Sequence, residues 1–130
     1  APLNIFDQDL IKTNTASYLK KEQIVIQARS IFLQGLLLIN KSELPEYFLD
    51  WGKVFEDYEV WLLKKNITSL EACVNYVYFQ ENIDKVIIGV MNVDQLKEIL
   101  EASKLKLKIS PSFNIQAREM LINPSMWRLS

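Results

Sequence analysis

Histidine is absent from this chain of 130 residues, and cysteine occurs once, as Cys73. Without histidine, the chain lacks the side chain that enzymes use most often as a general acid or base near neutral pH. A single cysteine cannot form an internal disulfide, and it cannot build a cysteine-rich metal site. We therefore expect neither a disulfide scaffold nor a metal centre, and the composition fits a protein of the reducing cytoplasm.

An excess of positive charge is also missing, because 15 basic residues face 16 acidic ones and leave a formal net charge of -1. Domains that bind nucleic acid usually carry a basic surplus, so we expect no nucleic-acid partner. The apolar runs at 31–39 and 86–90 are far shorter than the roughly 20 residues of a membrane-spanning helix, so we expect no membrane partner. The length predicts a single domain.

The sequence does contain strand-like and helical segments in alternation. Residues rich in β-branched and apolar side chains predict short strands at 2–6, 24–31 and 86–90. Apolar residues spaced three or four apart predict helices at 45–65 and 93–103. A polar stretch with a possible N-cap at Asn14 or Thr15 predicts a helix at 14–21, and the capping-box spacing of Thr68 and Glu71 predicts one at 68–80. A short helix is predicted at 114–121. The apolar run 32–39 fits either a buried strand or a loop packed over the core. Strands separated by helices indicate parallel βα units.

The stretch KVIIGVMNVDQLKEIL at 85–100 joins the last predicted strand to a helix. Asn92 stands at the expected N-cap position, and Gln95 three residues later completes a capping box. The first N–H groups of a helix have no partner within it, and together with the helix dipole they favour an anion such as phosphate. Gly89 has no side chain, so a ligand could approach its backbone closely. The same residues also suit an ordinary helix start.

Several stretches, in this order, resemble the landmarks of the aldo/keto reductases. They are LNIFDQ at 3–8, RSIFLQGLL at 29–37, VIIG at 86–89 with QLKE at 95–98, and NPSMW at 123–127. That family folds as a (β/α)8 barrel and reduces carbonyl compounds with NADPH. The resemblance implies an α/β chain forming a partial (β/α)8 TIM barrel, with about three parallel strands and four to six helices. Residues 1–130 would be the C-terminal part of the barrel domain, from strand six to the tail.

The resemblance also implies a cofactor site made of two segments. In the family, the loop after the seventh strand surrounds the pyrophosphate and ribose, and the matching residues here are Arg29, Ser30, Phe32, Leu33, Gln34 and Gly35. The last strand and helix of the family hold the adenosine 2′-phosphate and adenine, and the matching residues are Gly89, Met91, Asn92, Gln95, Glu98 and Ile99.

Departures from the family pattern leave the cofactor open between NADP, which the resemblance implies, and NAD. Met91 stands where a serine is common, and Ile99 replaces a common asparagine. The first turn of the last helix contains no arginine or lysine to pair with a 2′-phosphate. Arg29 replaces an aromatic residue that often stacks on the nicotinamide, so its guanidinium could instead face an anionic substrate or a carboxylate of the protein.

In the family, a tyrosine tuned by lysine, aspartate and usually histidine supplies the proton for carbonyl reduction. No segment of this chain matches those residues, and its five tyrosines lie in predicted helices, where packing explains them. The resemblance therefore implies a cofactor-binding portion of an NAD(P)H-dependent oxidoreductase that is inactive by itself. Its expected partners are a nicotinamide dinucleotide and either the N-terminal half of the barrel or another copy of the chain, because open strand edges favour pairing.

The alternative is a non-catalytic, small α/β domain that docks a partner protein. Its docking surface would be the aromatic face of the predicted helix 45–65, which carries Trp51, Phe55, Tyr58 and Trp61. An aromatic stripe at helical spacing is more often the side of a helix that faces the core. The burial of these side chains distinguishes the two interpretations.

Overall fold

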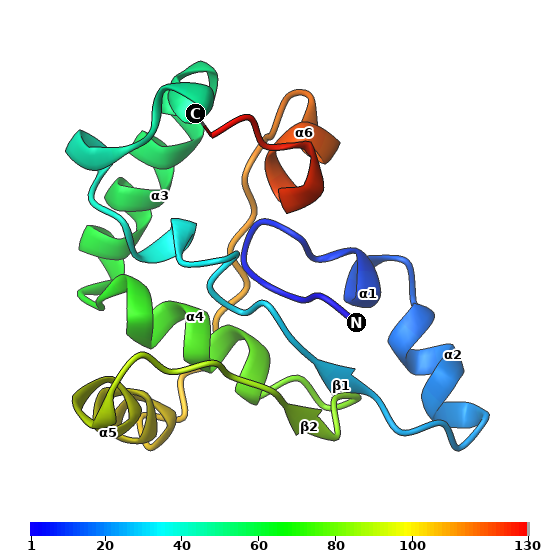
Figure 1. The fold of residues 1–130 in the computed structure, drawn as a ribbon. Coiled ribbons are helices and arrows are strands. Elements are labelled where there is room, and N and C mark those ends of the chain that lie inside the picture. Colours follow the sequence, from blue (N-terminus) through cyan, green and yellow to red (C-terminus); the bar gives the residue numbers. More distant parts are fainter. Residues whose placement is uncertain (130) are drawn as a thin grey trace.

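Two strands of two residues each form the sheet in the computed structural model, which describes residues 1–129. The strands are β1 (Gln27–Ala28) and β2 (Lys85–Val86). The α-helices are α1 (Asp9–Lys12), α2 (Thr15–Lys21), α3 (Gly52–Lys65), α4 (Ser69–Tyr78), α5 (Val93–Ser103) and α6 (Arg118–Ile122). Short 3-10 helices cover Leu36–Leu38, Lys41–Glu43, Glu46–Trp51 and Pro124–Met126. Helices therefore dominate the fold (Figure 1).

The expected partial barrel with three parallel strands is wrong for the described residues. β1 and β2 do pair in parallel, with Gln27 opposite Lys85 and Ala28 opposite Val86, but the pairing ends there. The opening segment adds only an isolated parallel bridge between Pro2 and Arg29. A strand exists only where a neighbouring segment completes its hydrogen-bond ladder. The predicted strand 24–31 finds such a neighbour at Gln27 and Ala28, and the predicted strand 86–90 finds one at Val86 alone, next to Lys85.

Most of the predicted helices are confirmed, with some differences in extent. α5 has the predicted bounds, and α4 begins with the predicted capping box, in which Thr68 accepts from the Glu71 N–H and Glu71 accepts from the Thr68 N–H. The long helix starts as the 3-10 helix Glu46–Trp51 before α3 begins. The run 32–39 is a loop with a 3-10 turn rather than a strand. The last helix begins later than expected, and α1 was not predicted.

Aromatic rings from both ends of the chain fill the core. The Phe6 ring lies 5.6 Å from the rings of both Phe55 and Tyr58, and 5.9 Å from the ring of Phe113, in edge-to-face geometry. Phe55 and Tyr58 are buried, and so is Trp51. Trp61 of α3 is half-buried, and its ring lies 6.1 Å from that of Phe113. Three of the four aromatic side chains that the alternative interpretation needs, Trp51, Phe55 and Tyr58, are thus packed inside this chain.

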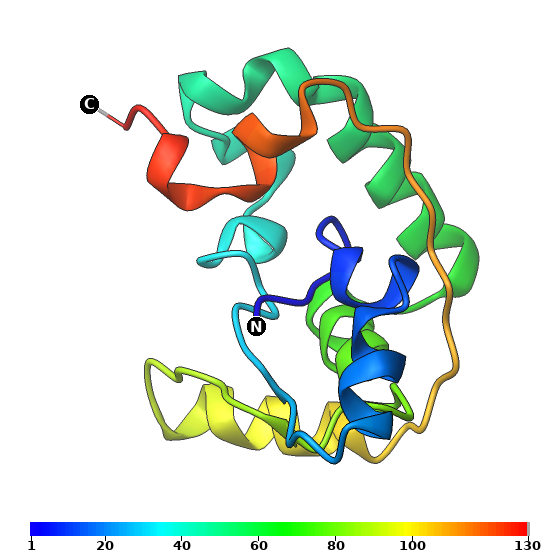
Figure 2. The ribbon, with the colours of Figure 1, turned by 90° about the vertical axis from the view of Figure 1, so that its right-hand side faces the viewer.

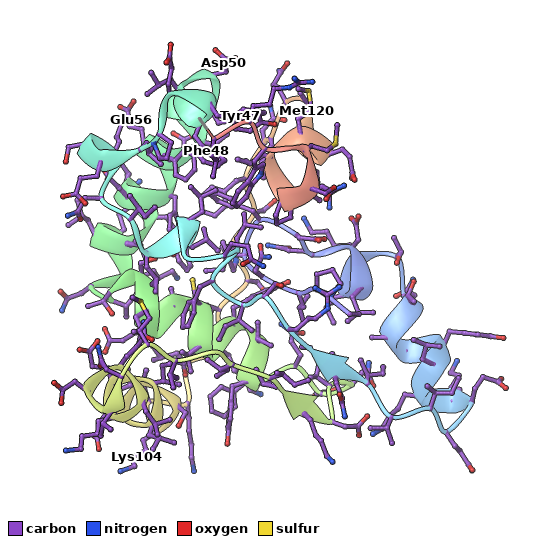
Figure 3. The ribbon with its side chains drawn as sticks, viewed as in Figure 1. Tyr47, Phe48, Asp50, Glu56, Lys104 and Met120 are labelled. Atoms are coloured by element: carbon purple, nitrogen blue, oxygen red, sulfur yellow. The ribbon has the colours of Figure 1, made fainter. Side chains whose placement is uncertain are left out.

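The C-terminal segment packs over the 3-10 helix that precedes α3. The Tyr47 hydroxyl donates to the Met120 carbonyl at 2.7 Å (Figure 3), and the Trp51 indole donates to the Gln116 carbonyl at 2.7 Å. The Phe48 and Trp127 rings meet edge to face at 4.8 Å. These contacts hold α6 against the rest of the molecule (Figure 2).

Packing against α4 sets the position of α5. Ile99 and Ala102 are the buried residues of α5. The buried Asn75 of α4 donates to the Ala102 carbonyl at 2.9 Å, and its side-chain oxygen accepts from the Leu107 N–H at 2.9 Å. Both ends of this amide are therefore satisfied inside the protein, which fixes the end of α5 and the chain that leaves it. None of the helices in the described part of the chain combines the length and apolarity needed to cross a membrane.

Candidate functional site

A cleft with a volume of about 570 Å³ opens where the two strands end. Parallel pairing brings the carboxyl ends of β1 and β2 to the same edge, which is where ligands bind in parallel α/β sheets. The segment after β1 and the segment after β2 face each other across this opening. The residues that line it are Arg29, Ser30, Ile31, Phe32, Gln34, Gly35, Leu38, Ile39, Ile87, Ile88, Gly89, Met91 and Gln95.

The loop 30–35 forms one wall of the cleft and has an unusual backbone. Ser30, Leu33 and Gln34 have φ values of 59°, 51° and 56°, and Gly35 has a φ of 84°. The left-handed region costs roughly 1–2 kcal/mol for a residue with a side chain. Such conformations concentrate at binding and catalytic sites. Leu33, which is buried, anchors the loop, and the Asn4 amide donates to the Ser30 carbonyl at 3.1 Å.

This backbone leaves donors free on the loop. Within residues 1–129, the N–H groups of Gln34 and Gly35 have no hydrogen-bond partner in the protein. The neighbouring N–H groups of Leu36 and Leu37 are used, because they donate to the carbonyls of Leu33 and Phe32. Adjacent free N–H groups in a left-handed turn are the arrangement from which backbone anion sites are made.

The start of α5 forms the opposite wall. The Asn92 side chain accepts from the Gln95 N–H at 2.8 Å and thus caps the helix as predicted. The Gln95 side-chain oxygen accepts from the Met91 N–H at 2.8 Å and not from the Asn92 N–H, so the expected capping box is only half formed. This bond orients the Gln95 amide and leaves its Nε2 atom without a partner among the described residues. Gln95 lines the cleft, so the helix start contributes an amide whose donor atom is not used within the described residues.

Arg29 directly follows β1, and Gly89 lies shortly after the end of β2. The Arg29 guanidinium makes one weak contact, 3.4 Å from the Ser30 hydroxyl, and no carboxylate of residues 1–129 pairs with it. A Cβ atom placed on Gly89 would meet no heavy atom within 4 Å, so the protein's own packing does not require glycine there. Both positions face space that the protein leaves open.

Comparison with protein-family profiles, curated proteins and solved structures finds no match. The candidate site therefore depends on geometry together with the sequence pattern. Most of the residues that the sequence marked line the cleft: Arg29, Ser30, Phe32, Gln34, Gly35, Gly89, Met91 and Gln95.

The remaining residues that the resemblance implied for cofactor binding do not line the cleft. Leu33 is a buried residue of the loop and lines the neighbouring hollow, and Asn92 is exposed and caps α5. Glu98 is exposed on the next turn of α5. Ile99 is 4% exposed and belongs to the core, so its side chain is not a wall of the cleft.

A second, smaller hollow of about 260 Å³ adjoins the cleft and shares Arg29, Ser30 and Gln34 with it. Its other wall includes Asp7 and Glu119. No sequence pattern predicted this hollow, because its walls combine residues 29–34 with residues from both ends of the chain.

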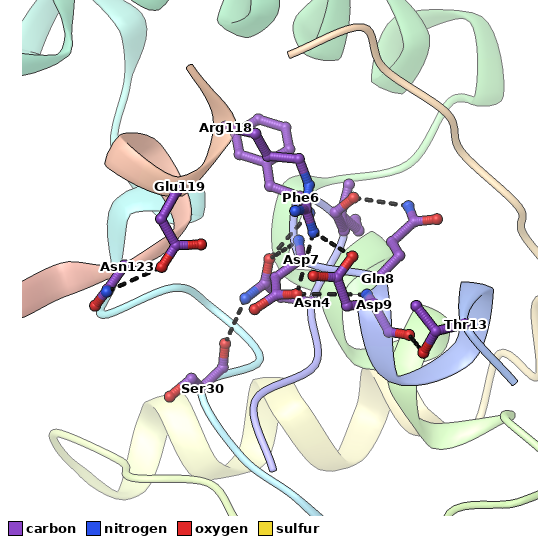
Figure 4. A network of polar contacts seen from close by, with 11 residues as sticks. Asn4, Phe6, Asp7, Gln8, Asp9, Thr13, Ser30, Arg118, Glu119 and Asn123 are labelled. Atoms are coloured by element: carbon purple, nitrogen blue, oxygen red, sulfur yellow. Dashed lines mark hydrogen bonds and ion pairs between the residues drawn. The ribbon is translucent and has the colours of Figure 1, made fainter. Parts of the chain in front are cut away.

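Charged residues from both ends of the chain meet beside this hollow (Figure 4). The Arg118 guanidinium lies 2.6 Å from the Asp9 carboxylate and 3.5 Å from that of Asp7. Burial raises the pKa of the Asp7 carboxyl, and the N–H of Asp9 and the charge of Arg118 oppose that rise. The ion pairs thus connect α6 to the N-terminal segment. Among residues 1–129, no cluster of acidic and cysteine side chains is suited to a metal ion.

Proposed function

We propose that the cleft binds a nicotinamide dinucleotide and that the chain is the cofactor-binding portion of an oxidoreductase of the aldo/keto reductase type. The observation that supports this proposal is the meeting of two segments in one cleft. The sequence marked 29–35 and 89–95 separately, and the parallel pairing of β1 with β2 brings them face to face. The proposal rests on the cleft and its donors, because the described residues do not form a barrel.

The donors of the cleft fit a pyrophosphate. The free N–H groups of Gln34 and Gly35 can donate to phosphate oxygens, as can the Ser30 hydroxyl. The Arg29 guanidinium adds a cation that can make paired hydrogen bonds to a phosphate. These groups lie on one continuous stretch of backbone, so a single anionic group could engage several of them together.

The remaining walls fit the rings of a dinucleotide. Ile31, Phe32 and Leu38 line the cleft on the side of the loop, and Ile87 and Ile88 line it on the other side. Small-molecule sites typically combine apolar walls with a few polar groups, and they measure about 300–1,000 Å³. The cleft, at about 570 Å³, lies within that range.

Binding, rather than turnover, is the function that we propose for this chain alone. Carbonyl reduction needs a proton donor beside the bound substrate, and no tyrosine lines the cleft. Tyr58 and Tyr76 are buried, and burial raises the pKa of both hydroxyls, that of Tyr76 to about 12. We propose that catalytic residues come from a partner, either the complementary half of the enzyme or another copy of this chain.

A binding titration with matched arginine variants tests the proposal. NADH is titrated into the chain, and the fluorescence anisotropy of the dinucleotide reports binding. Arg29→Gln should weaken binding by about 10- to 100-fold, because a hydrogen bond to a charged group contributes roughly 1.5–3 kcal/mol. Arg128→Gln is the control, since it removes the same charge from a different groove. Absence of binding by a chain shown to be folded, or equal weakening by both variants, would contradict the proposal.

A further inference from the structure

Helix α5 carries apolar side chains on two sides, and only one of these sides faces the core. Ile99 and Ala102 are buried on the side that packs against α4. Val93, Leu96 and Leu100 form a second apolar row, which we call the α5 stripe, and they are 65%, 42% and 53% exposed. At about 100° per residue, these three positions fall within an arc of about 60°. Because α5 lies at the edge of the molecule, no other element of residues 1–129 covers the α5 stripe (Figure 1 and Figure 2).

Charged residues follow one border of the α5 stripe, and their signs alternate along the helix. In chain order they are Asp94, Lys97, Glu101 and Lys104, all of them exposed. The helical spacing places these four on the border away from the buried Ile99, whereas Glu98 lies farther around the helix. Glu101 pairs with Lys104 at 3.1 Å, but Asp94 and Lys97 form no ion pair within residues 1–129. An apolar centre with a polar rim is the usual anatomy of a protein interface.

The order of charges along this border is complementary to itself when the helix direction is reversed. In an antiparallel pair of α5 helices centred near Ile99, Lys97 of one copy lies opposite Glu101 of the other. In the same register Asp94 lies opposite Lys104. A twofold axis produces each of these contacts twice, so every charge of the border faces the opposite sign. A parallel pair would instead place Lys97 against Lys97 and Glu101 against Glu101.

We propose that two copies of this chain associate through the α5 stripe as an antiparallel dimer with twofold symmetry. Leu96 and Leu100 of both copies form the apolar centre of the interface, and the ion pairs of the charged border surround it on one side. None of these residues lines the cleft, so the association does not depend on dinucleotide binding. One pair of helices makes a small interface, and we therefore expect a dimer that dissociates in the micromolar range.

Sedimentation equilibrium of the full chain over about 1–500 μM tests the inference. We expect a reversible equilibrium between monomer and dimer. Leu100→Gln should weaken dimerisation by at least about tenfold, because a symmetric interface loses the same apolar side chain twice. Leu63→Gln is the matched control and should leave dimerisation unchanged, since Leu63 of α3 is 79% exposed and lies outside the α5 stripe.

Charge exchange tests the antiparallel register. Lys97→Glu alone and Glu101→Lys alone each place like charges opposite each other, so each should weaken self-association by about tenfold. A mixture of the two single variants should form a heterodimer, because positions 97 and 101 of the two chains then face opposite signs. Far-UV circular dichroism of each single variant verifies that α5 stays folded.

Each outcome decides for or against the dimer. A monomer at every concentration would overturn the inference and would mean that the α5 stripe is left exposed or is covered by a different partner. Equal weakening by Leu100→Gln and Leu63→Gln, or growth into larger open-ended assemblies, would place the contact elsewhere. Single charge variants that self-associate as well as the original chain, or a mixture of them that stays monomeric, would refute the antiparallel register.

Discussion

Two glycines line the cleft, and their backbone conformations differ. A Cβ atom placed on either Gly35 or Gly89 would meet no heavy atom within 4 Å. Gly35 has a φ of 84°, in the left-handed region, whereas Gly89 lies outside that region. Alanine at each position therefore compares the effect of backbone conformation while the surrounding space stays open in both cases.

The expected difference in unfolding free energy follows from this geometry. Replacing glycine by alanine restricts the unfolded chain and stabilises a compatible position by about 0.4–1 kcal/mol. That effect is common to both variants and cancels in their comparison. The left-handed conformation costs alanine a further 1–2 kcal/mol, approximately, and only at Gly35. Gly35→Ala should therefore be less stable than Gly89→Ala by about 1–2 kcal/mol.

Urea denaturation followed by tryptophan fluorescence measures this difference. Both variants should unfold with the same dependence on urea concentration, so the shift in midpoint reports stability. Gly52→Ala, in the first turn of α3, is the control, because its backbone is helical and a Cβ there also meets open space. Equal stabilities for the two cleft variants, or a less stable Gly89→Ala, would show that loop 30–35 does not have the left-handed backbone described above.

Two further predictions concern single side chains. The N–H of Ile26 and the ammonium of Lys20 lower the pKa of the Asp84 carboxyl, so its stabilising effect is present above the unfolded value of 3.8 and is lost as pH falls through the lower folded value. The difference in urea midpoint between the chain and Asp84→Asn should thus disappear in acid, and a difference that persists below about pH 2 would contradict this. Cys73 is buried, and burial raises the pKa of its thiol to about 12, so iodoacetamide should label it only as the chain unfolds. Labelling of the native chain as fast as in urea would refute that.

The helix starts were predictable because they depend on residues close together in sequence. Thr68 and Glu71 form the full capping box that the sequence predicts. Asn92 accepts from the Gln95 N–H as predicted, but the Gln95 side chain accepts from the Met91 N–H and not from the Asn92 N–H, so that capping box is half formed. The strands were not predictable in extent, because a ladder needs a partner segment. β1 and β2 are separated by more than fifty residues of chain, and no local pattern shows where their pairing ends.

The candidate site was likewise predictable only in part from the sequence. The sequence by itself determined the caps, the helical faces and the two segments that carry the cleft residues, since those patterns depend on neighbouring positions. The tertiary structure alone decided that 29–35 and 89–95 face each other, that Ile99 is buried, and that Arg118 pairs with Asp7 and Asp9. The physical reason is that burial, strand pairing and ion pairs between distant segments depend on which parts of the chain become neighbours, and composition and spacing do not specify this.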